Sequence, residues 1–110
     1  AENEILLTKS VNSCFIGTPL KQILDEKRCT TVVIIGLTTD HCVSTTTRMA
    51  ANYGYNTLVV SDATATFNKI GLMNKVYDSE LIHQTALASL KDEFATIISS
   101  DELFEMLDRG

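Results

Sequence analysis

Apolar residues occur along the chain in two arrangements that alternate. Short apolar or β-branched runs without a polar face lie at residues 4–8 (EILLT), 31–35 (TVVII), 57–61 (TLVVS) and 95–98 (ATII). Such runs are typical of strands buried on both faces of a parallel sheet. After each run, apolar residues recur at helical spacing, which predicts helices over residues 19–27, 41–53, 79–90 and 100–107. The repeated strand–helix order is typical of βαβ units, so we expect an α/β fold whose parallel sheet is flanked by helices.

Cap and turn residues mark several of these boundaries. Thr18 and Pro19 suit the N-cap and first position of a helix, and Gly54 ends the second helix. The sequence SSDE at residues 99–102 has the form of a capping box. The polar segment 62–78 lacks periodicity and is expected to be a functional or mobile loop.

Composition limits the class of protein. The chain has 110 residues, of which 45% are hydrophobic and 21% are charged, as in a single folded domain spanning residues 1–110. Nine basic and 14 acidic residues give a net charge of −5, which argues against nucleic acid or an anionic membrane as a partner. The longest apolar run, at residues 32–35, is too short to span a bilayer.

The cysteines do not suggest a disulfide framework. Cys14, Cys29 and Cys42 are odd in number and contain no C-x-x-C pair, unlike disulfide scaffolds and zinc ribbons. We therefore expect reduced thiols in an intracellular protein with a cytoplasmic location.

Cys42 occupies a position suited to chemistry. It follows the strand at 31–35 and the turn at 36–41, and it opens a helix. Ligands of open parallel sheets bind beyond the carboxyl ends of the strands. Free amide groups at a helix start favour a thiolate and can hold an oxyanion. Cys42 is thus a candidate acyl-transfer nucleophile, and the alternative from position alone is a small buried apolar residue.

Residues 36–46 (GLTTDHCVSTT) resemble the nucleophile segment of the isochorismatase-like cysteine hydrolases. That superfamily includes nicotinamidases, N-carbamoylsarcosine amidohydrolases and ureidoacrylate amidohydrolases. The resemblance continues at residues 50–55, 59–66 (VVSDATAT) and 83–90 (HQTALASL), and residues 9–20 (KSVNSCFIGTPL) resemble the family's catalytic-lysine segment. It therefore covers nearly the whole chain.

The resemblance implies a catalytic role for several residues. Cys42 would attack a substrate carbonyl as a thiolate, and Lys9 would favour that ionised form. The backbone N–H groups of Thr38 and Cys42 would form the oxyanion hole, and a cis peptide would join Leu37 to Thr38. Family members that act on a vinyl ether lack the cysteine. Its presence therefore implies hydrolysis of a carbon–nitrogen bond in a small amide, ureido or carbamoyl compound, through a thioester.

Other polar and aromatic positions have competing interpretations. Phe15 is expected to line the substrate pocket, with plain packing as the alternative. Asp62 either binds substrate or braces a loop, and Asp40 is expected to be an N-cap. His41 and His83 are interpreted as packing or hydrogen-bonding residues rather than metal ligands. No metal and no cofactor are expected within the chain.

The resemblance also implies that part of the domain is missing. The family's sheet order is 3-2-1-4-5-6 in a three-layer α/β/α fold, and this chain would supply strands 3, 4, 5 and 6, an incomplete C-terminal part. Its catalytic aspartate, the general base, would lie before Glu4. The strand at 4–8 would then have no neighbour, and the strand at 31–35 would be a bare edge. The expected partners are the missing N-terminal segment, a small-molecule substrate and further copies in a homo-oligomer.

Two other functions compete with hydrolysis. One is a non-catalytic α/β interaction module that retains the fold. The other is a thiol redox protein, which the lack of a C-x-x-C pair disfavours.

Overall fold

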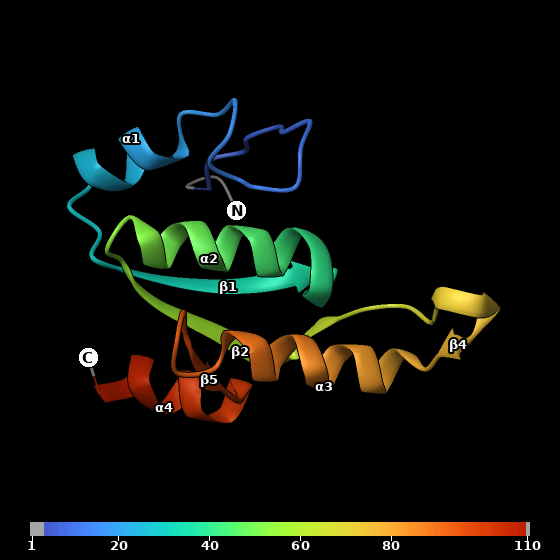
Figure 1. Ribbon diagram of the computed structural model, residues 1–110. Helices are drawn as coiled ribbons and strands as arrows, with labels where there is room; N and C mark the ends of the chain where they lie inside the picture. The colour runs from blue at the N-terminus through green and yellow to red at the C-terminus, as the bar shows by residue number, and fades with distance from the viewer. Residues whose placement is uncertain (1–3, 110) are drawn as a thin grey trace.

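The computed structural model describes residues 4–109, which form a parallel sheet between layers of helices (Figure 1). The main elements are α1 (Leu20–Glu26), β1 (Thr31–Leu37), the π-helical turn η1 (Thr39–Val43), α2 (Ser44–Asn52), β2 (Asn56–Ala65), α3 (Ser79–Leu90), β5 (Thr96–Ile98) and α4 (Ser100–Arg109). A two-stranded hairpin of β3 (Lys69–Ile70) and β4 (Val76–Tyr77), with a short 3-10 turn η2 (Leu72–Asn74), lies between β2 and α3. No helix in this part of the chain is both long and apolar enough to cross a membrane.

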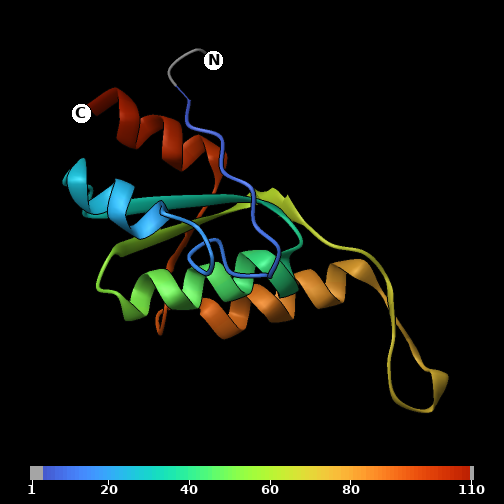
Figure 2. The same ribbon diagram turned by 90° about the horizontal axis from the view of Figure 1, so that it is seen from above.

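The sheet has the order β1-β2-β5, and both pairings are parallel. Helices α2 and α3 cover one face, and α4 covers the other (Figure 2). Because both faces of β2 are covered, its residues 57–60 are all buried. Val59 packs with Val43 and Leu87 on one side, whereas Leu58 and Val60 pack toward Leu103 of α4 on the other. The predicted α/β/α arrangement is therefore confirmed.

Strand β1 is an edge strand, as expected. Among residues 4–109 it pairs with β2 alone. Its side chains alternate between half-buried and exposed, so burial on both faces is a wrong prediction for this run. The physical reason is that α4 packs over β2 and β5, which leaves Val33, Ile35 and Leu37 exposed by 42%, 61% and 60%.

The predicted strand at residues 4–8 is wrong. Residues 4–9 have no regular secondary structure, and Leu6 is 93% exposed. A β-strand requires a neighbouring strand to satisfy its backbone groups, and none pairs with this segment in the described part of the chain.

Three other boundaries differ from the prediction. Pro19 is itself the N-cap of α1, which begins at Leu20. A π-helical turn precedes α2, so Cys42 lies inside that turn and not at the start of a regular helix. The segment 62–78 contains the end of β2 and the β3–β4 hairpin, which extends away from the sheet (Figures 1 and 2).

The two C-terminal helices begin as predicted. Helix α3 has the predicted bounds, 79–90. The capping box before α4 is formed in both directions: the Ser99 N–H donates to Glu102 Oε1 at 3.0 Å, and the Glu102 N–H donates to Ser99 Oγ at 3.1 Å.

Candidate active site

Cys42 lies in the turn that leaves the carboxyl end of β1 and is half-buried. The N–H groups of His41 and Val43 both donate to the Thr38 carbonyl, at 3.1 and 3.2 Å. The peptide bond between Leu37 and Thr38 is cis, at the position implied by the resemblance. The turn thus places Thr38 and Cys42 on one short, tightly bonded loop.

Lys9 and Cys42 meet although 33 positions separate them in the sequence. Lys9 Nζ donates to Cys42 Sγ at 3.2 Å and to the Val11 carbonyl at 2.9 Å. Asn12 Oδ1 lies 3.9 Å from the same sulfur. An ammonium group at this distance stabilises a thiolate electrostatically.

The segment that carries Lys9 is anchored to α2. The Cys14 N–H donates to Thr46 Oγ1 at 3.0 Å, and the Ser13 hydroxyl, which is fully buried, contacts Met49 Sδ. These contacts hold an irregular segment against the helix that follows the cysteine.

A second polar cluster joins the same turn to the hairpin. Asp40 accepts from Lys69 Nζ at 2.8 Å and from Thr66 Oγ1 at 2.7 Å, and His41 Nε2 lies 2.6 Å from Lys69 Nζ. Burial disfavours the charged form of Asp40, but the hydrogen bonds from Lys69 and Thr66 outweigh it and lower the pKa to about 2. Asp40 therefore links two segments and is not the predicted N-cap.

Sequence reasoning did not identify Lys69 or Thr66 as part of this cluster. The only signal was the long polar segment itself, because the pairing with Asp40 spans 26 positions for Thr66.

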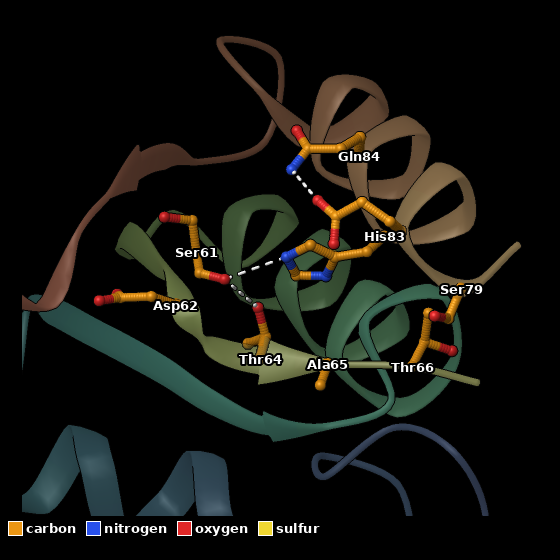
Figure 3. Close-up of a pocket in the computed structure, with 9 residues that line it drawn as sticks. Ser61, Asp62, Thr64, Ala65, Thr66, Ser79, His83 and Gln84 are labelled. Atoms are coloured by element: carbon orange, nitrogen blue, oxygen red, sulfur yellow. Dashed lines mark hydrogen bonds between the residues drawn. The ribbon is translucent and has the colours of Figure 1, made fainter.

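Asp62 braces the start of α4. Its carboxylate accepts from the Ser100 N–H at 2.7 Å and from the Ser100 hydroxyl at 2.6 Å, and these hydrogen bonds lower the Asp62 pKa. This geometry favours the bracing interpretation over substrate binding. Asp62 also lines a polar cavity of about 450 Å³ between the end of β2 and α3 (Figure 3).

Phe15 lies in an aromatic cluster. It is buried, contacts the Tyr53 ring edge-on at 5.2 Å between centroids, and stacks on Tyr55 at 6.2 Å. It also lines an apolar groove of about 430 Å³ that runs along β1. The contacts of Phe15 favour the packing alternative.

His83 is buried and uses both ring nitrogens. Nδ1 lies 2.7 Å from the hydroxyl of Thr39, and Nε2 lies 3.0 Å from the carbonyl of Ser61. No cluster of three or more His, Cys, Asp or Glu side chains suited to a metal occurs within residues 4–109.

Comparison with known proteins places this geometry in a family. The model of the isochorismatase domain matches residues 1–102. The chain belongs to the isochorismatase family. The isochorismatase-family protein YrdC of Bacillus subtilis is 53% identical over 102 residues, which are 93% of this chain and 54% of that protein.

Further relatives support the same assignment. Nicotinamidase 3 of Arabidopsis thaliana is 32% identical over 98 residues, which are 89% of this chain and 44% of that protein. A solved isochorismatase-family structure from Chromobacterium violaceum superimposes with a TM-score of 0.95 at 28% identity, covering 100% of this chain and 57% of that one. The chain spans about half the length of the curated relatives it matches.

Proposed function

We propose that these residues carry the nucleophilic half of a cysteine-dependent hydrolase. The substrate is a small molecule with an amide, ureido or carbamoyl group, and the enzyme cleaves its carbon–nitrogen bond. The observation that carries the proposal is the 3.2 Å contact between Lys9 Nζ and Cys42 Sγ at the carboxyl end of a parallel strand. An amide-hydrolysing relative, Nicotinamidase 3, supports the substrate class.

In the first half-reaction the Cys42 thiolate attacks the carbonyl carbon. The new S–C bond displaces the carbonyl π pair onto oxygen, and the N–H groups of Thr38 and Cys42 stabilise the resulting oxyanion. Collapse of this intermediate breaks the C–N bond, and the nitrogen takes a proton from the acid form of the aspartate expected before Glu4 as ammonia or an amine leaves. The acyl group remains on sulfur as a thioester.

In the second half-reaction water adds to the thioester and gives up a proton to a general base. The C–S bond then breaks, the acid product leaves, and sulfur departs as the thiolate beside Lys9. The base is the aspartate expected from a segment before Glu4. General acid–base catalysis of this kind contributes roughly 10²–10⁴-fold to rate.

The same proposal includes the surroundings of the site. The N-terminal segment of the domain would pair with the free edge of β1, and the complete protein would be a cytoplasmic homo-oligomer without a metal or cofactor held by this chain. The support for the missing segment is the exposed β1 edge together with the half-length match to the relatives.

The test is release of ammonia or amine by the full-length protein from a panel of nicotinamide, an N-carbamoyl amino acid and a ureido acid. The proposal predicts turnover of at least one compound, loss of that turnover in Cys42→Ala, and unchanged turnover in Cys29→Ala as the matched control. Turnover that survives in Cys42→Ala would overturn the mechanism. No turnover, combined with equal and slow alkylation of all three cysteines, would favour a non-catalytic interaction module.

A further inference from the structure

We propose that His83 is a positioning residue whose imidazole fixes the catalytic turn to the sheet through Thr39. It joins the Thr39 hydroxyl to the Ser61 carbonyl, at 2.7 and 3.0 Å. The inference rests on the proposed function, because the role of this link would be to hold the backbone of the proposed oxyanion hole in place.

Thr39 is the point at which this link meets the active site. It is 0% exposed, follows Thr38 directly and precedes Cys42 by three residues. A shift of its side chain would therefore move the backbone on which both proposed oxyanion donors lie. Misplacement of a catalytic group by about 1 Å can cost on the order of 10²-fold in rate.

The direction of the hydrogen bonds follows from the chemistry of the partners. The Ser61 carbonyl can only accept, so His83 Nε2 carries a hydrogen. In the neutral ring, Nδ1 is then an acceptor, and the Thr39 hydroxyl donates to it. Both ring nitrogens are occupied, which suits a fixed brace rather than a proton shuttle.

The link joins three separate parts of the fold. Thr39 belongs to η1, His83 to α3 and Ser61 to β2, and Figure 3 shows the imidazole directed from α3 toward Ser61. The carboxylates that line the same cavity have other partners: Asp62 accepts from Ser100 and Glu80 accepts from Gln84. His83 is 8% exposed, and a buried polar chain whose groups are all bonded defines a single arrangement.

Two pairs of matched variants in the full-length protein test the proposal. Thr39→Val removes the hydroxyl with little change in shape, whereas Thr39→Ser retains it. The side-chain amide of His83→Asn falls near the Nδ1 position and keeps only the Thr39 end of the link, whereas that of His83→Gln falls near Nε2 and keeps only the Ser61 end.

The expected result is a selective loss of turnover rate. Thr39→Val, His83→Asn and His83→Gln each break one end of the link, so each should lower kcat by about 10- to 100-fold and change KM by less than about 3-fold. Thr39→Ser retains both hydrogen bonds and should stay within about 5-fold of the wild type. The double variant Thr39→Val/His83→Gln should be no slower than the worse single variant, because both break the same link.

A purely structural role would give a different pattern. With a purely structural role, Thr39→Val would lower the free energy of unfolding in urea while the kcat of its folded fraction stayed at the wild-type value. That result would overturn the proposal. Wild-type kcat in either His83→Asn or His83→Gln would also overturn it.

Two further measurements separate this inference from the proposed function. Imidazole ¹⁵N shifts of His83 should show a protonated Nε2 and a hydrogen-bonded, unprotonated Nδ1, and Thr39→Val should shift Nδ1. Cys42 alkylation by iodoacetamide should change at least about 3-fold in Thr39→Val and not in Thr39→Ser. If both the ¹⁵N shifts and the alkylation rates change as expected but no substrate turns over, the hydrolase proposal fails and the Thr39–His83 link stands. If turnover is found and neither readout changes, the link fails alone.

Discussion

Replacing Lys9 with methionine removes the ammonium group from the Cys42 sulfur and keeps a side chain of similar length. At the observed separation of 3.2 Å, Coulomb's law gives roughly 1.3 kcal/mol in bulk water and roughly 5 kcal/mol at an effective dielectric constant of about 20. Because the contact is solvent-exposed, screening places the value in the lower part of this range, at ~1.4–2.8 kcal/mol. An interaction energy of this size corresponds to a factor of about 10 to 100 in an equilibrium constant.

The alkylation rate of Cys42 at neutral pH should fall by less than this factor. A thiolate without its ammonium partner is more basic and more nucleophilic, with a Brønsted coefficient of about 0.4–0.5, so the net loss of rate should be about 3- to 15-fold.

The assay is iodoacetamide labelling of the full-length protein, followed at each cysteine by peptide mass spectrometry. Cys14 and Cys29 serve as internal references in the same molecule, and Lys91→Met is the control, because Lys91 pairs with Asp92 at 3.1 Å. An unchanged Cys42 rate in Lys9→Met at neutral pH would refute the electrostatic reasoning. An equal loss of rate in Lys91→Met would show that net charge, not the contact, sets the rate.

Three further predictions concern the fold around the site. The folded-state pKa of Asp40, about 2, lies below the ordinary 3.8, so the ionised carboxylate stabilises the fold by about 2 kcal/mol above about pH 4. This stabilisation is lost as the pH falls toward 2. Urea unfolding should show the loss in the wild type and not in Asp40→Asn. Ser99→Ala should lower the free energy of unfolding by about 1 kcal/mol while Ser99→Asp retains it, and equal losses in both would contradict the capping role. In the full-length protein, backbone amides of β1 should exchange with deuterium as slowly as those of β2, and fast exchange confined to β1 would show that its edge is free.

The local sequence pattern was sufficient to predict elements that depend on their own segment or that are covered on both faces. Helix α3 matches its predicted bounds because its apolar spacing and polar cap act within one segment. The unbroken apolar run of β2 correctly predicted a buried strand, because helices cover both faces of β2. Strand β1 was located from its β-branched run, but its burial depends on whether a helix covers each face, which the local sequence does not indicate.

The errors have a common physical origin in partners distant along the chain. Residues 4–8 have strand propensity, but a strand also needs a neighbour. The N-cap interpretation of Asp40 used adjacent residues, whereas Lys69 and Thr66 reach it from the hairpin. For His83, hydrogen bonding was foreseen, but its partner Thr39 lies 44 positions away and could not be named.

The candidate site was predicted better than its surroundings. Lys9 and Cys42 were paired through the family resemblance, and the structure brings their side chains into contact. The resemblance favoured a pocket role for Phe15, and the role of Asp62 was left open. Their contacts favour packing for Phe15 and bracing for Asp62.

The proposed mechanism requires a covalent bond between Cys42 Sγ and the acyl group of the substrate. The most direct measurement is peptide mass mapping of the full-length protein, quenched in acid during turnover of a panel amide. We expect an added mass equal to the acyl group on the Cys42 peptide, removed by hydroxylamine and absent from Cys42→Ala. Turnover in which Cys42 stays unmodified and reacts with iodoacetamide no faster than Cys29 would contradict it.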